Sequence, residues 1–320
     1  MIKIAIVGYG NLGKAVERIA VKSNDFDISG IFTRRDPSTL KSPYGTPFFR
    51  QEEIFGFKNI DVAVICTGSA NDVTELGAKL AGAFNTVDSF DTHVKMPEYF
   101  AEMDRTATDS GHLCFVGIGW DPGLFSLMRA LLTGVLPDGV SHTFWGAGVS
   151  QGHSEAVRKL DGVLDAKQYT VPKSEAMELA RSGGGEWLAD RDRHTRVCYV
   201  VAEDGADKER IEREIKTMPN YFEPYDTTVH FISADEMKKE HSGMPHGGVV
   251  MRTGEVNGKS QSAEFSLKLS SNPDFTASVI VAYVRANAYL NKLGERGARS
   301  IADIPVSALY SGENIVKKFI

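Results

Sequence analysis

Three glycines near the start of the chain have the spacing of a phosphate-binding loop. Gly8, Gly10 and Gly13 form a G-x-G-x-x-G pattern between the apolar run IKIAIV and a helical pattern that begins at Lys14. Gly8 allows a tight turn, Gly10 lets the backbone approach a pyrophosphate, and Gly13 lets helix and strand pack closely. We therefore expect a dinucleotide at the helix N-terminus, with a ligand-free glycine turn as the alternative. The residues expected at this loop are Gly8, Tyr9, Gly10, Asn11, Leu12 and Gly13.

The end of the next apolar run indicates which dinucleotide to expect. An enzyme that uses NAD usually has Asp or Glu there, bound to the ribose 2′-hydroxyl. This sequence has Thr33, Arg34 and Arg35 instead, and Asp36 comes one residue later, where it is better placed to begin a turn. Arginine binds a 2′-phosphate through paired hydrogen bonds. The cofactor we predict is NADP, and two solvated surface arginines are the alternative.

A third loop follows the apolar run DVAVIC. Loops at the carboxyl ends of strands line the ligand crevice of an open α/β sheet, so small polar residues there can approach the ribose and the nicotinamide. A helix cap by Ser69 is an equally good interpretation. The residues expected in this loop are Cys66, Thr67, Gly68, Ser69 and Ala70.

Two carboxylates come at the ends of later strands. Asp91 lies in SFDT and Asp121 lies in WDPG. The same crevice rule directs both toward the nicotinamide. A carboxylate can act as a general base if burial raises its pKa. The alternative is an N-cap or a turn carboxylate, especially for Asp121 ahead of Pro-Gly.

The elements that must position these residues follow from the apolar pattern. Apolar runs alternate with amphipathic stretches over residues 1–121, which is typical of βαβ units and a parallel sheet. We therefore predict an α/β domain of the Rossmann type, with a doubly wound parallel sheet that binds the dinucleotide. The expected strands are Lys3–Val7, Ile28–Thr33, Val62–Cys66, Thr86–Asp88 and Leu113–Gly117, and the expected helices are Asn11–Val21, Asp72–Gly82 and Pro97–Ser110.

Beyond residue 121 the pattern indicates a mixed or antiparallel sheet. We predict that residues 122–320 form an α+β region for substrate binding and dimerisation, whose C-terminal segment packs back on the first domain. Three consecutive glycines make Arg181–Ala189 an expected exposed loop. The strand-like segments are SHTFWGAG, KQYTVP, RVCYVVAE, TTVHFISA and SAEFSLKL, and the helical ones are Asp207–Thr217 and Phe275–Leu293.

Composition limits the class of protein. The 320 residues are 42% hydrophobic and 24% charged, which is ordinary for a soluble globular protein, and the net charge of −6 argues against nucleic-acid binding. No apolar run approaches the roughly 18–20 residues that span a membrane, and the first run predicts a strand better than a signal peptide. Cys66, Cys114 and Cys198 form no C-x-x-C pair, so we expect reduced thiols in a cytoplasmic protein.

Two groups of residues resemble metal ligands. Asp88, Asp91 and His93 lie in VDSFDTH, and His241 precedes His246 by five residues. Neither group has the H-E-x-x-H or paired-cysteine spacing of a metal site. Hydride transfer to a nicotinamide also needs no metal, so we expect none.

Sequence blocks along nearly the whole chain resemble the meso-diaminopimelate D-dehydrogenase family. They are GYGNLG, FTRRDP, VDSFDTH, GWDPGLFS, HTFWGAGVSQGHSEA, MPHGG and SNPDFTAS, in this order. The resemblance implies a homodimer that oxidatively deaminates the D-centre of meso-2,6-diaminopimelate with NADP. The products would be L-2-amino-6-oxopimelate, ammonia and NADPH, and the reverse reaction would feed lysine and cell-wall peptide synthesis.

The resemblance also implies where the substrate binds. It places Asp91 and Asp121 near the D-centre amine, with Asp121 as a candidate for its deprotonation, and His153 is a rival proton shuttle. Thr92 is expected beside the cofactor. The glycine-rich run FWGAGVSQGHS, a poor regular element, is expected to bind the D-centre carboxylate. The residues expected around the D-centre are Asp91, Trp120, Asp121, Trp145, Gln151 and Gly152.

The distal L-centre needs its own partners, because the two ends of the substrate are nearly alike. The resemblance places Arg196 on the distal carboxylate, where a guanidinium binds with two hydrogen bonds. The other residues expected at that end are Thr170, His246 and Asn272. Two other functions stay open: a dehydrogenase of another amino acid with a different pocket, and a non-catalytic NADPH-binding sensor.

Overall fold

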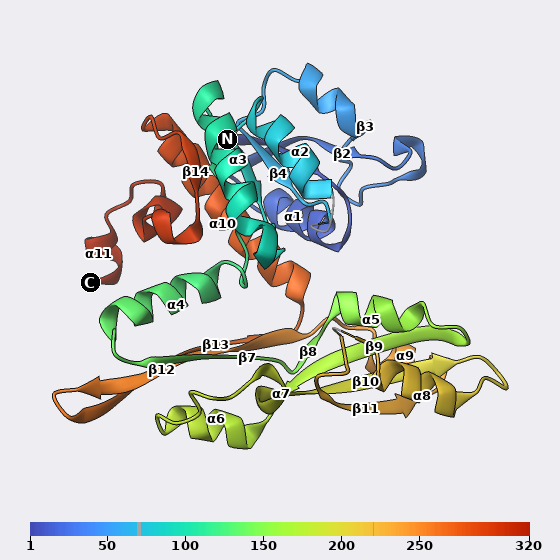
Figure 1. The fold of residues 1–320 in the computed structure, drawn as a ribbon. Helices are drawn as coiled ribbons and strands as arrows, with labels where there is room; N and C mark the ends of the chain where they lie inside the picture. Colours follow the sequence, from blue (N-terminus) through green and yellow to red (C-terminus); the bar gives the residue numbers. More distant parts are fainter. Residues whose placement is uncertain (69–71, 220) are drawn as a thin grey trace. The chain divides into compact units, whose positions relative to one another are not determined.

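The structure is a computed structural model that describes residues 1–68, 72–219 and 221–320. The described residues divide into two compact units (Figure 1). Unit 1 consists of Met1–Leu127 and Pro273–Ile320, and unit 2 consists of Met128–Asn272. The predicted division after residue 121 therefore differs from the observed one: residues 122–127 and 273–320 belong to unit 1.

Unit 1 is built on a parallel sheet with the strand order β14-β6-β5-β4-β1-β2-β3. The order reverses between β1 and β4, which are neighbours and pair Val7 with Ile65 at their carboxyl ends. Such a switch point is where doubly wound sheets bind ligands. The predicted fold class is confirmed. The strands are β1 Ile2–Val7, β2 Phe26–Thr33, β3 Phe48–Arg50, β4 Val62–Ile65, β5 Thr86–Asp88, β6 Leu113–Phe115 and β14 Gly297–Arg299.

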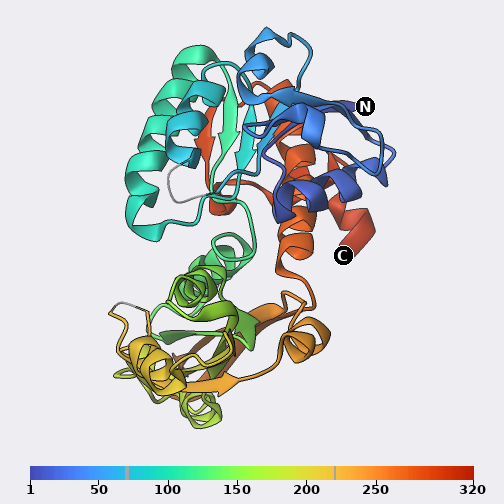
Figure 2. The same ribbon diagram turned by 90° about the vertical axis from the view of Figure 1, so that its right-hand side faces the viewer.

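Helices cover both faces of this sheet (Figure 2). Successive side chains of a strand point to opposite faces. In β1, Ile4 and Ile6 accordingly join the core under α1 and α10, while Ala5 and Val7 join the core under α2 and α3. Burial on both faces explains why the strands are continuously apolar. The helices are α1 Asn11–Val21, α2 Asp72–Ala81, α3 Met96–Ser110, α10 Asn272–Lys292 and the short α11 Ile315–Phe319.

Unit 2 contains a mixed sheet and an antiparallel sheet. In the order β11-β10-β9-β8, the pair β10–β11 is parallel and the others are antiparallel. The order β13-β12-β7 is antiparallel throughout. The strands are β7 Val140–Trp145, β8 Gly148–Val149, β9 Val163–Pro172, β10 His194–Ala202, β11 Asp226–Phe231, β12 His246–Val256 and β13 Lys259–Leu269.

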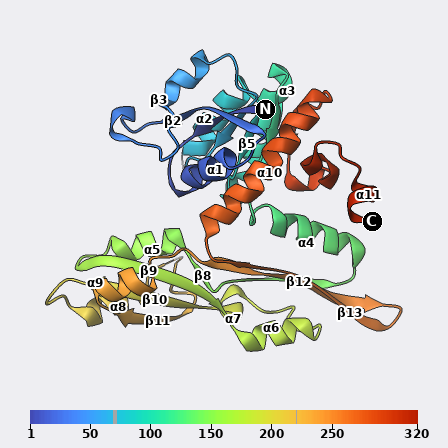
Figure 3. The same cartoon turned by 180° about the vertical axis from the view of Figure 1, so that it is seen from behind.

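Short helices pack on the sheets of unit 2. Helices α5 and α8 share an apolar core with β9 and β10. Helix α6 lies on one side of the sheet β13-β12-β7 and α4 on the other (Figure 3). Helix α4 Leu124–Val135 begins in unit 1 and continues into unit 2. The other helices of unit 2 are α5 Gln151–Arg158, α6 Ser174–Arg181, α7 Asp190–Arg193, α8 Lys208–Lys216 and α9 Ala234–Glu240. None of the helices in the described residues is long and apolar enough to cross a membrane.

Several elements were not predicted from the sequence. They are helices α4, α5, α6, α7, α9 and α11 and strands β3, β12 and β14. Arg181 ends α6 instead of opening the predicted loop. Within that loop, most residues are exposed as expected, but Leu188 is buried in the core beneath α6.

One polar side chain ties the returning helix α10 to the sheet. Asn287 is fully buried, and its amide donates to the carbonyl of Leu113 at 3.0 Å and to that of Thr86 at 3.3 Å. These bonds link α10 to strands that precede it by more than 170 residues. A buried amide without such partners would cost folding free energy.

Replacement of Asn287 by Ala should lower the free energy of unfolding by about 1–3 kcal/mol, because two buried carbonyls lose a donor. Urea unfolding followed by circular dichroism measures this. Asn291→Ala, on the same helix at a half-buried position, is the matched control and should cost less. Equal stability of the Asn287 variant and the wild type would contradict the structural role of the amide.

Candidate functional site

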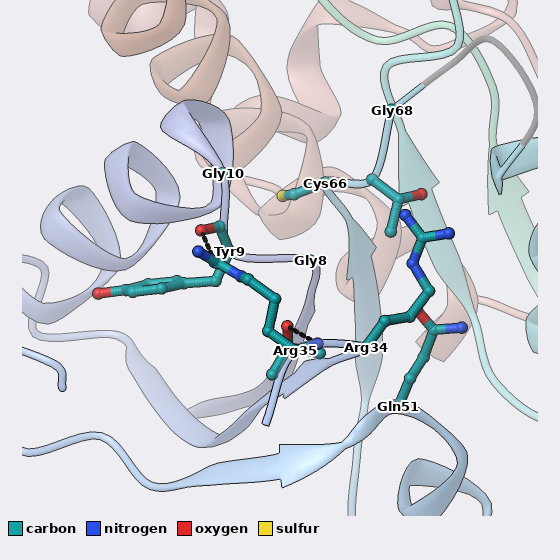
Figure 4. A pocket seen from close by; sticks show the side chains of 10 residues that line it. Gly8, Tyr9, Gly10, Arg34, Arg35, Gln51, Cys66 and Gly68 are labelled. Atoms are coloured by element: carbon teal, nitrogen blue, oxygen red, sulfur yellow. Dashed lines mark hydrogen bonds between the residues drawn. The ribbon is translucent and has the colours of Figure 1, made fainter. Parts of the chain in front are cut away.

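A cavity of about 250 Å³ lies at the carboxyl ends of β1, β2 and β4 in unit 1 (Figure 4). Loops that are predicted separately from the sequence come together here. The residues that line the cavity are Gly8, Tyr9, Gly10, Thr33, Arg34, Arg35, Gln51, Cys66, Thr67 and Gly68. Ser69 and Ala70, which are predicted for the same loop as Cys66, lie outside the described residues.

Glycine stands at the three positions of the fingerprint for different physical reasons. A Cβ on Gly13 would lie 2.1 Å from the Gly8 carbonyl oxygen, and one on Gly8 would lie 2.9 Å from the Cys66 backbone. Packing therefore demands both. A Cβ on Gly10 would meet no described protein atom within 4 Å. The protein itself does not require glycine at position 10, whereas a pyrophosphate approaching the backbone would.

The two arginines reach different sides of the cavity. The Arg35 guanidinium donates to the Tyr9 carbonyl, and the Arg35 N–H donates to the Thr33 hydroxyl at 3.2 Å. The Arg34 side chain lies on the side of Gln51 and Gly68 (Figure 4). No Asp or Glu is among the described lining residues. This positive, carboxylate-free end suits a phosphate group.

Asp36 begins the next turn, as expected. Its carboxylate accepts the Ser38 N–H at 3.0 Å, and this hydrogen bond lowers the pKa of the Asp36 carboxyl.

Gln51 was missed by the sequence analysis, because it reaches the cavity only through the pairing of β3 with β2, where Arg50 lies opposite Thr33. No local pattern around Gln51 could have indicated this.

Tyr9, Asn11 and Leu12 contribute less to the cavity than their place in the fingerprint suggests. The Tyr9 ring points away from it, and the Tyr9 hydroxyl donates to the fully buried Glu17, which also accepts the Ser42 hydroxyl. Burial and Glu17 raise the pKa of the Tyr9 phenol. Leu12 packs against the core, and Asn11 is the exposed first residue of α1. Tyr9 therefore offers only its backbone to a ligand in the cavity.

The two candidate catalytic carboxylates follow neighbouring strands of unit 1. Asp91 is exposed and comes three residues after β5, and Asp121 is half-buried and comes after β6. Strands β5 and β6 pair directly, with Val87 opposite Phe115. Thr92 is half-buried beside Asp91. Both carboxylates therefore follow the carboxyl ends of neighbouring parallel strands.

Trp120 is mostly a packing residue. Its ring is buried and lies edge-on to Phe125, with centroids 5.3 Å apart.

Among the described residues, no group of three or more His, Cys, Asp or Glu side chains could hold a metal ion.

In unit 2, a row across the mixed sheet brings Gly148, Thr170 and Arg196 together, because these residues are paired across β8, β9 and β10. The Arg196 side chain is buried, donates to the Thr170 hydroxyl and stacks 3.9 Å from the Tyr225 ring centroid. Its Nε has no hydrogen-bond partner, and no Asp or Glu of the described residues forms an ion pair with it. Burial lowers the pKa of this guanidinium.

Such a buried cation costs free energy unless an anion compensates it. The physical expectation for Arg196 is therefore an anionic ligand, and a carboxylate bound by both guanidinium edges fits its geometry. Thr170 holds the guanidinium from one side and the Tyr225 ring covers it from another.

Gln151, His246 and Asn272 gather around the segment that begins at Met244. The Gln151 amide donates to the Met244 sulfur at 2.8 Å, and the Asn272 N–H donates to the Met244 carbonyl at 2.9 Å. The His246 ring lies against Gly148, where a Cβ would be 2.5 Å from the imidazole. Three predicted substrate residues from distant parts of the sequence thus lie in one region of unit 2.

Trp145 is held by a buried histidine that the sequence analysis did not single out. His194 Nε2 accepts the Trp145 N–H at 2.9 Å, and the two rings lie 5.5 Å apart. Burial lowers the pKa of His194 to about 4, so the ring is neutral at pH 7 and Nε2 is free to accept. His194 therefore fixes the backbone of Trp145.

The run FWGAGVSQGHS is more regular than predicted. Strand β7 ends at Trp145, and Gln151 and Gly152 form the first turn of α5. The helix can begin there because the Ser150 hydroxyl caps it by accepting the His153 N–H at 3.5 Å. Burial, with a smaller contribution from Arg196, lowers the pKa of His153 to about 4. At this pKa the His153 ring is neutral at pH 7 and is no stronger a base than an ordinary carboxylate.

Comparison with known proteins places both units in one family. A sequence model of the diaminopimelic acid dehydrogenase C-terminal domain matches residues 119–271. The meso-diaminopimelate D-dehydrogenase of Ureibacillus thermosphaericus is 50% identical over 323 residues, covering 100% of this chain and 99% of the relative.

Solved structures agree over the same length. The C. glutamicum DAP dehydrogenase in complex with DAP is 43% identical with a TM-score of 0.90, covering 99% of this chain and 97% of that one. An engineered D-amino acid dehydrogenase bound to NADP+ is 42% identical with a TM-score of 0.85, covering 99% and 98%. From its full-length identity to these enzymes, the chain belongs to the meso-diaminopimelate D-dehydrogenase family.

Proposed function

We propose that the chain catalyses the reversible NADP-dependent oxidative deamination of meso-2,6-diaminopimelate at its D-centre. The products are L-2-amino-6-oxopimelate, ammonia and NADPH, and the reaction serves lysine biosynthesis. The observation that carries the proposal is the buried Arg196 guanidinium without a carboxylate partner among the described residues, in a chain that is 50% identical over its whole length to a meso-diaminopimelate D-dehydrogenase.

The cavity of unit 1 supports the choice of cofactor. Gly10 leaves room for the pyrophosphate, and Gly8 and Gly13 allow the close packing of the loop beside it. Arg34 and Arg35 provide cations for the 2′-phosphate. When bound, NADP supplies the hydride acceptor. We also assign NADP binding to Thr33, Cys66, Thr67 and Gly68, which line the cavity, and to Asp91 and Thr92, beside the nicotinamide.

We assign proton transfer to a carboxylate of unit 1. The ammonium group at the D-centre must become neutral before the carbon that bears it can lose a hydride to the nicotinamide. We assign this proton to Asp121, which is half-buried. Asp91 holds the same amine by an ion pair, and Trp120 excludes water beside it.

Unit 2 supplies the donors for the two carboxylates. Gln151, the Gly152 N–H at the start of α5 and the Trp145 indole bind the carboxylate of the D-centre. Arg196 and Thr170 bind the carboxylate of the distal L-centre. His246 and Asn272 complete that end. Because only the distal end has a guanidinium, the D-centre of the meso isomer is the one that reacts.

We further propose that the protein is a cytoplasmic homodimer. Helix α4 carries exposed apolar side chains, and Leu131 and Val135 are 53% and 71% exposed. An exposed apolar stretch of this kind suits burial against a second copy. Cys66, Cys114 and Cys198 are buried free thiols, which suits a reducing compartment.

NADP reduction at 340 nm with the meso, LL and DD isomers of diaminopimelate, each with NADP or NAD, tests the function. We expect turnover with the meso isomer and NADP, because the LL isomer has no D-centre and the DD isomer has the wrong distal configuration. Turnover of monocarboxylate D-amino acids at equal efficiency would point to another amino-acid dehydrogenase. NADPH binding without any turnover would point to a sensor.

Alanine at both Arg34 and Arg35 should weaken NADP binding by at least about tenfold and leave NAD binding nearly unchanged, because only the 2′-phosphate loses its partners. Titration calorimetry with both nucleotides measures the ratio. Arg105→Ala, at an exposed position of α3, is the control for the lost charge. An equal loss for NADP and NAD would contradict the assignment of the two arginines.

Arg196→Met should raise the KM for meso-diaminopimelate by about ten- to a hundredfold while NADP affinity stays unchanged, because one charge-assisted contact to the distal carboxylate is lost. Steady-state kinetics with both substrates measures this. Arg213→Met, at an exposed position of α8, is the matched control. If the KM rose equally for D-amino acids with a single carboxylate, Arg196 would not bind the distal end.

A further inference from the structure

A buried carboxylate in unit 1 has no place in the proposed chemistry. Asp88 is the last residue of β5 and is fully buried. Its sequence context suggested a metal ligand only superficially. An apolar side chain would suit this position of a covered parallel strand, because burying a carboxylate costs several kcal/mol unless hydrogen bonds compensate it. The contacts of Asp88 show what compensates it.

Both oxygens of the Asp88 carboxylate have donors. Oδ1 accepts the Phe90 N–H at 2.9 Å and the Gly117 N–H at 3.0 Å. Oδ2 accepts the Tyr99 hydroxyl at 2.9 Å. The Asp88 backbone carbonyl also accepts the Ile118 N–H at 2.7 Å. Burial raises the pKa of the Asp88 carboxyl, and the bonds from Gly117, Phe90 and Tyr99 oppose that rise.

The two backbone donors belong to the two loops that carry the candidate catalytic carboxylates. Phe90 directly precedes Asp91 in the loop after β5, and Gly117 leads through Ile118 to Asp121 in the loop after β6. Gly117 has a φ of +67°, a conformation that glycine adopts without strain. One carboxylate oxygen therefore bridges the starts of both loops.

Tyr99 holds the carboxylate in this orientation from helix α3. Its side chain is buried, and its ring packs at 4.5 Å from the Phe90 ring. A Cβ on Gly77 would lie 2.4 Å from the Tyr99 hydroxyl, so α2 packs directly against this hydroxyl. With the hydroxyl on Oδ2, Oδ1 is left to face the two N–H groups.

We propose that Asp88 is a positioning residue of the dehydrogenase reaction, because it sets the separation of the loops that carry Asp91 and Asp121. The inference rests on the proposed function, since it assumes that these two carboxylates act on the substrate. A misplacement of about 1 Å in reacting groups can cost about 100-fold in rate. Neither Asp88 nor its hydrogen-bond donors Phe90, Tyr99 and Gly117 are among the residues that line the cofactor cavity.

The test compares Asp88→Leu with Asp88→Asn. Leucine removes the bridge, and kcat should fall by about 100-fold while NADPH affinity stays within about threefold. Asparagine keeps Oδ1 as the acceptor for both N–H groups and can turn its NH2 to the Tyr99 oxygen, so kcat should recover to within about threefold of the wild type. Hydrogen exchange should quicken in peptides that cover residues 89–92 and 117–121 in the leucine variant only.

Asp104→Leu is the matched control. Asp104 also lies in unit 1 and accepts a backbone N–H, that of Ala298 at 2.8 Å. It does so at Ala298 of β14, which pairs with Cys114 within β6 and lies outside the two loops. This variant should lower the Tm without changing kcat or the exchange of the two loop peptides.

Each outcome separates the two proposals. If the wild type turned over no diaminopimelate isomer, the proposed function would fail, while faster exchange of both loops in Asp88→Leu would still support the bridge. If the wild type were active and Asp88→Leu kept its kcat, or if Asp88→Asn lost as much as Asp88→Leu, the positioning role would be overturned. Should the leucine variant not fold, Asp88→Ser, which is too short to reach both N–H groups, takes its place with the same expectation.

Discussion

The close approach of β1, α1 and β4 at the switch point of the parallel sheet is the constraint on which the nucleotide site depends. Backbone atoms of Gly8, Gly13 and Cys66 approach so closely that a single added Cβ would overlap the chain. That packing places Gly10, the residue that precedes α1, at the cavity, where a Cβ on it would meet no described protein atom within 4 Å. The β2 and β3 strands then add the cationic end, because their carboxyl ends lie beside the same switch point.

Buried charges in the two units are compensated in different ways. Glu17 accepts two hydroxyl groups, and Asp88 accepts two N–H groups and a phenol, so both carboxylates are satisfied by the protein itself. Arg196 has a hydroxyl and an aromatic ring but no anion among the described residues. A buried ionisable group with protein hydrogen-bond partners can stabilise the fold. A buried cation without an ion-pair partner favours the binding of an anionic ligand.

The side chains proposed to bind the substrate are divided between the units by charge. The carboxylates that suit an ammonium group, Asp91 and Asp121, belong to unit 1, and the guanidinium and amide donors that suit carboxylates belong to unit 2. A substrate with two ammonium groups and two carboxylates matches this inventory. Arg196 is proposed to decide which end of the substrate reacts, because a guanidinium is proposed at the distal L-centre and none at the D-centre.

The sequence by itself determined the features that depend on local patterns. Strand period, glycine spacing and the arginine pair after β2 are all read within a few residues, and the parallel sheet of unit 1 and the predicted loops of its cavity agree with the structure. The family resemblance added Thr170 and Arg196, which no local pattern singles out, and their roles stay predictions. The sequence also indicated that the C-terminal segment returns to the first domain.

Only the tertiary structure decided the features that depend on distant contacts. Strand β12 begins at His246 and continues with two glycines, which argue against a strand. A Cβ on Gly247 would lie 2.1 Å from Leu267, and one on Gly248 would lie 2.2 Å from Phe144. Gln51 reaches the cavity through strand pairing, and Asp88 bridges two loops through hydrogen bonds. In each case the reason for the residue lies in atoms that are far away in the chain, so no local pattern can show it.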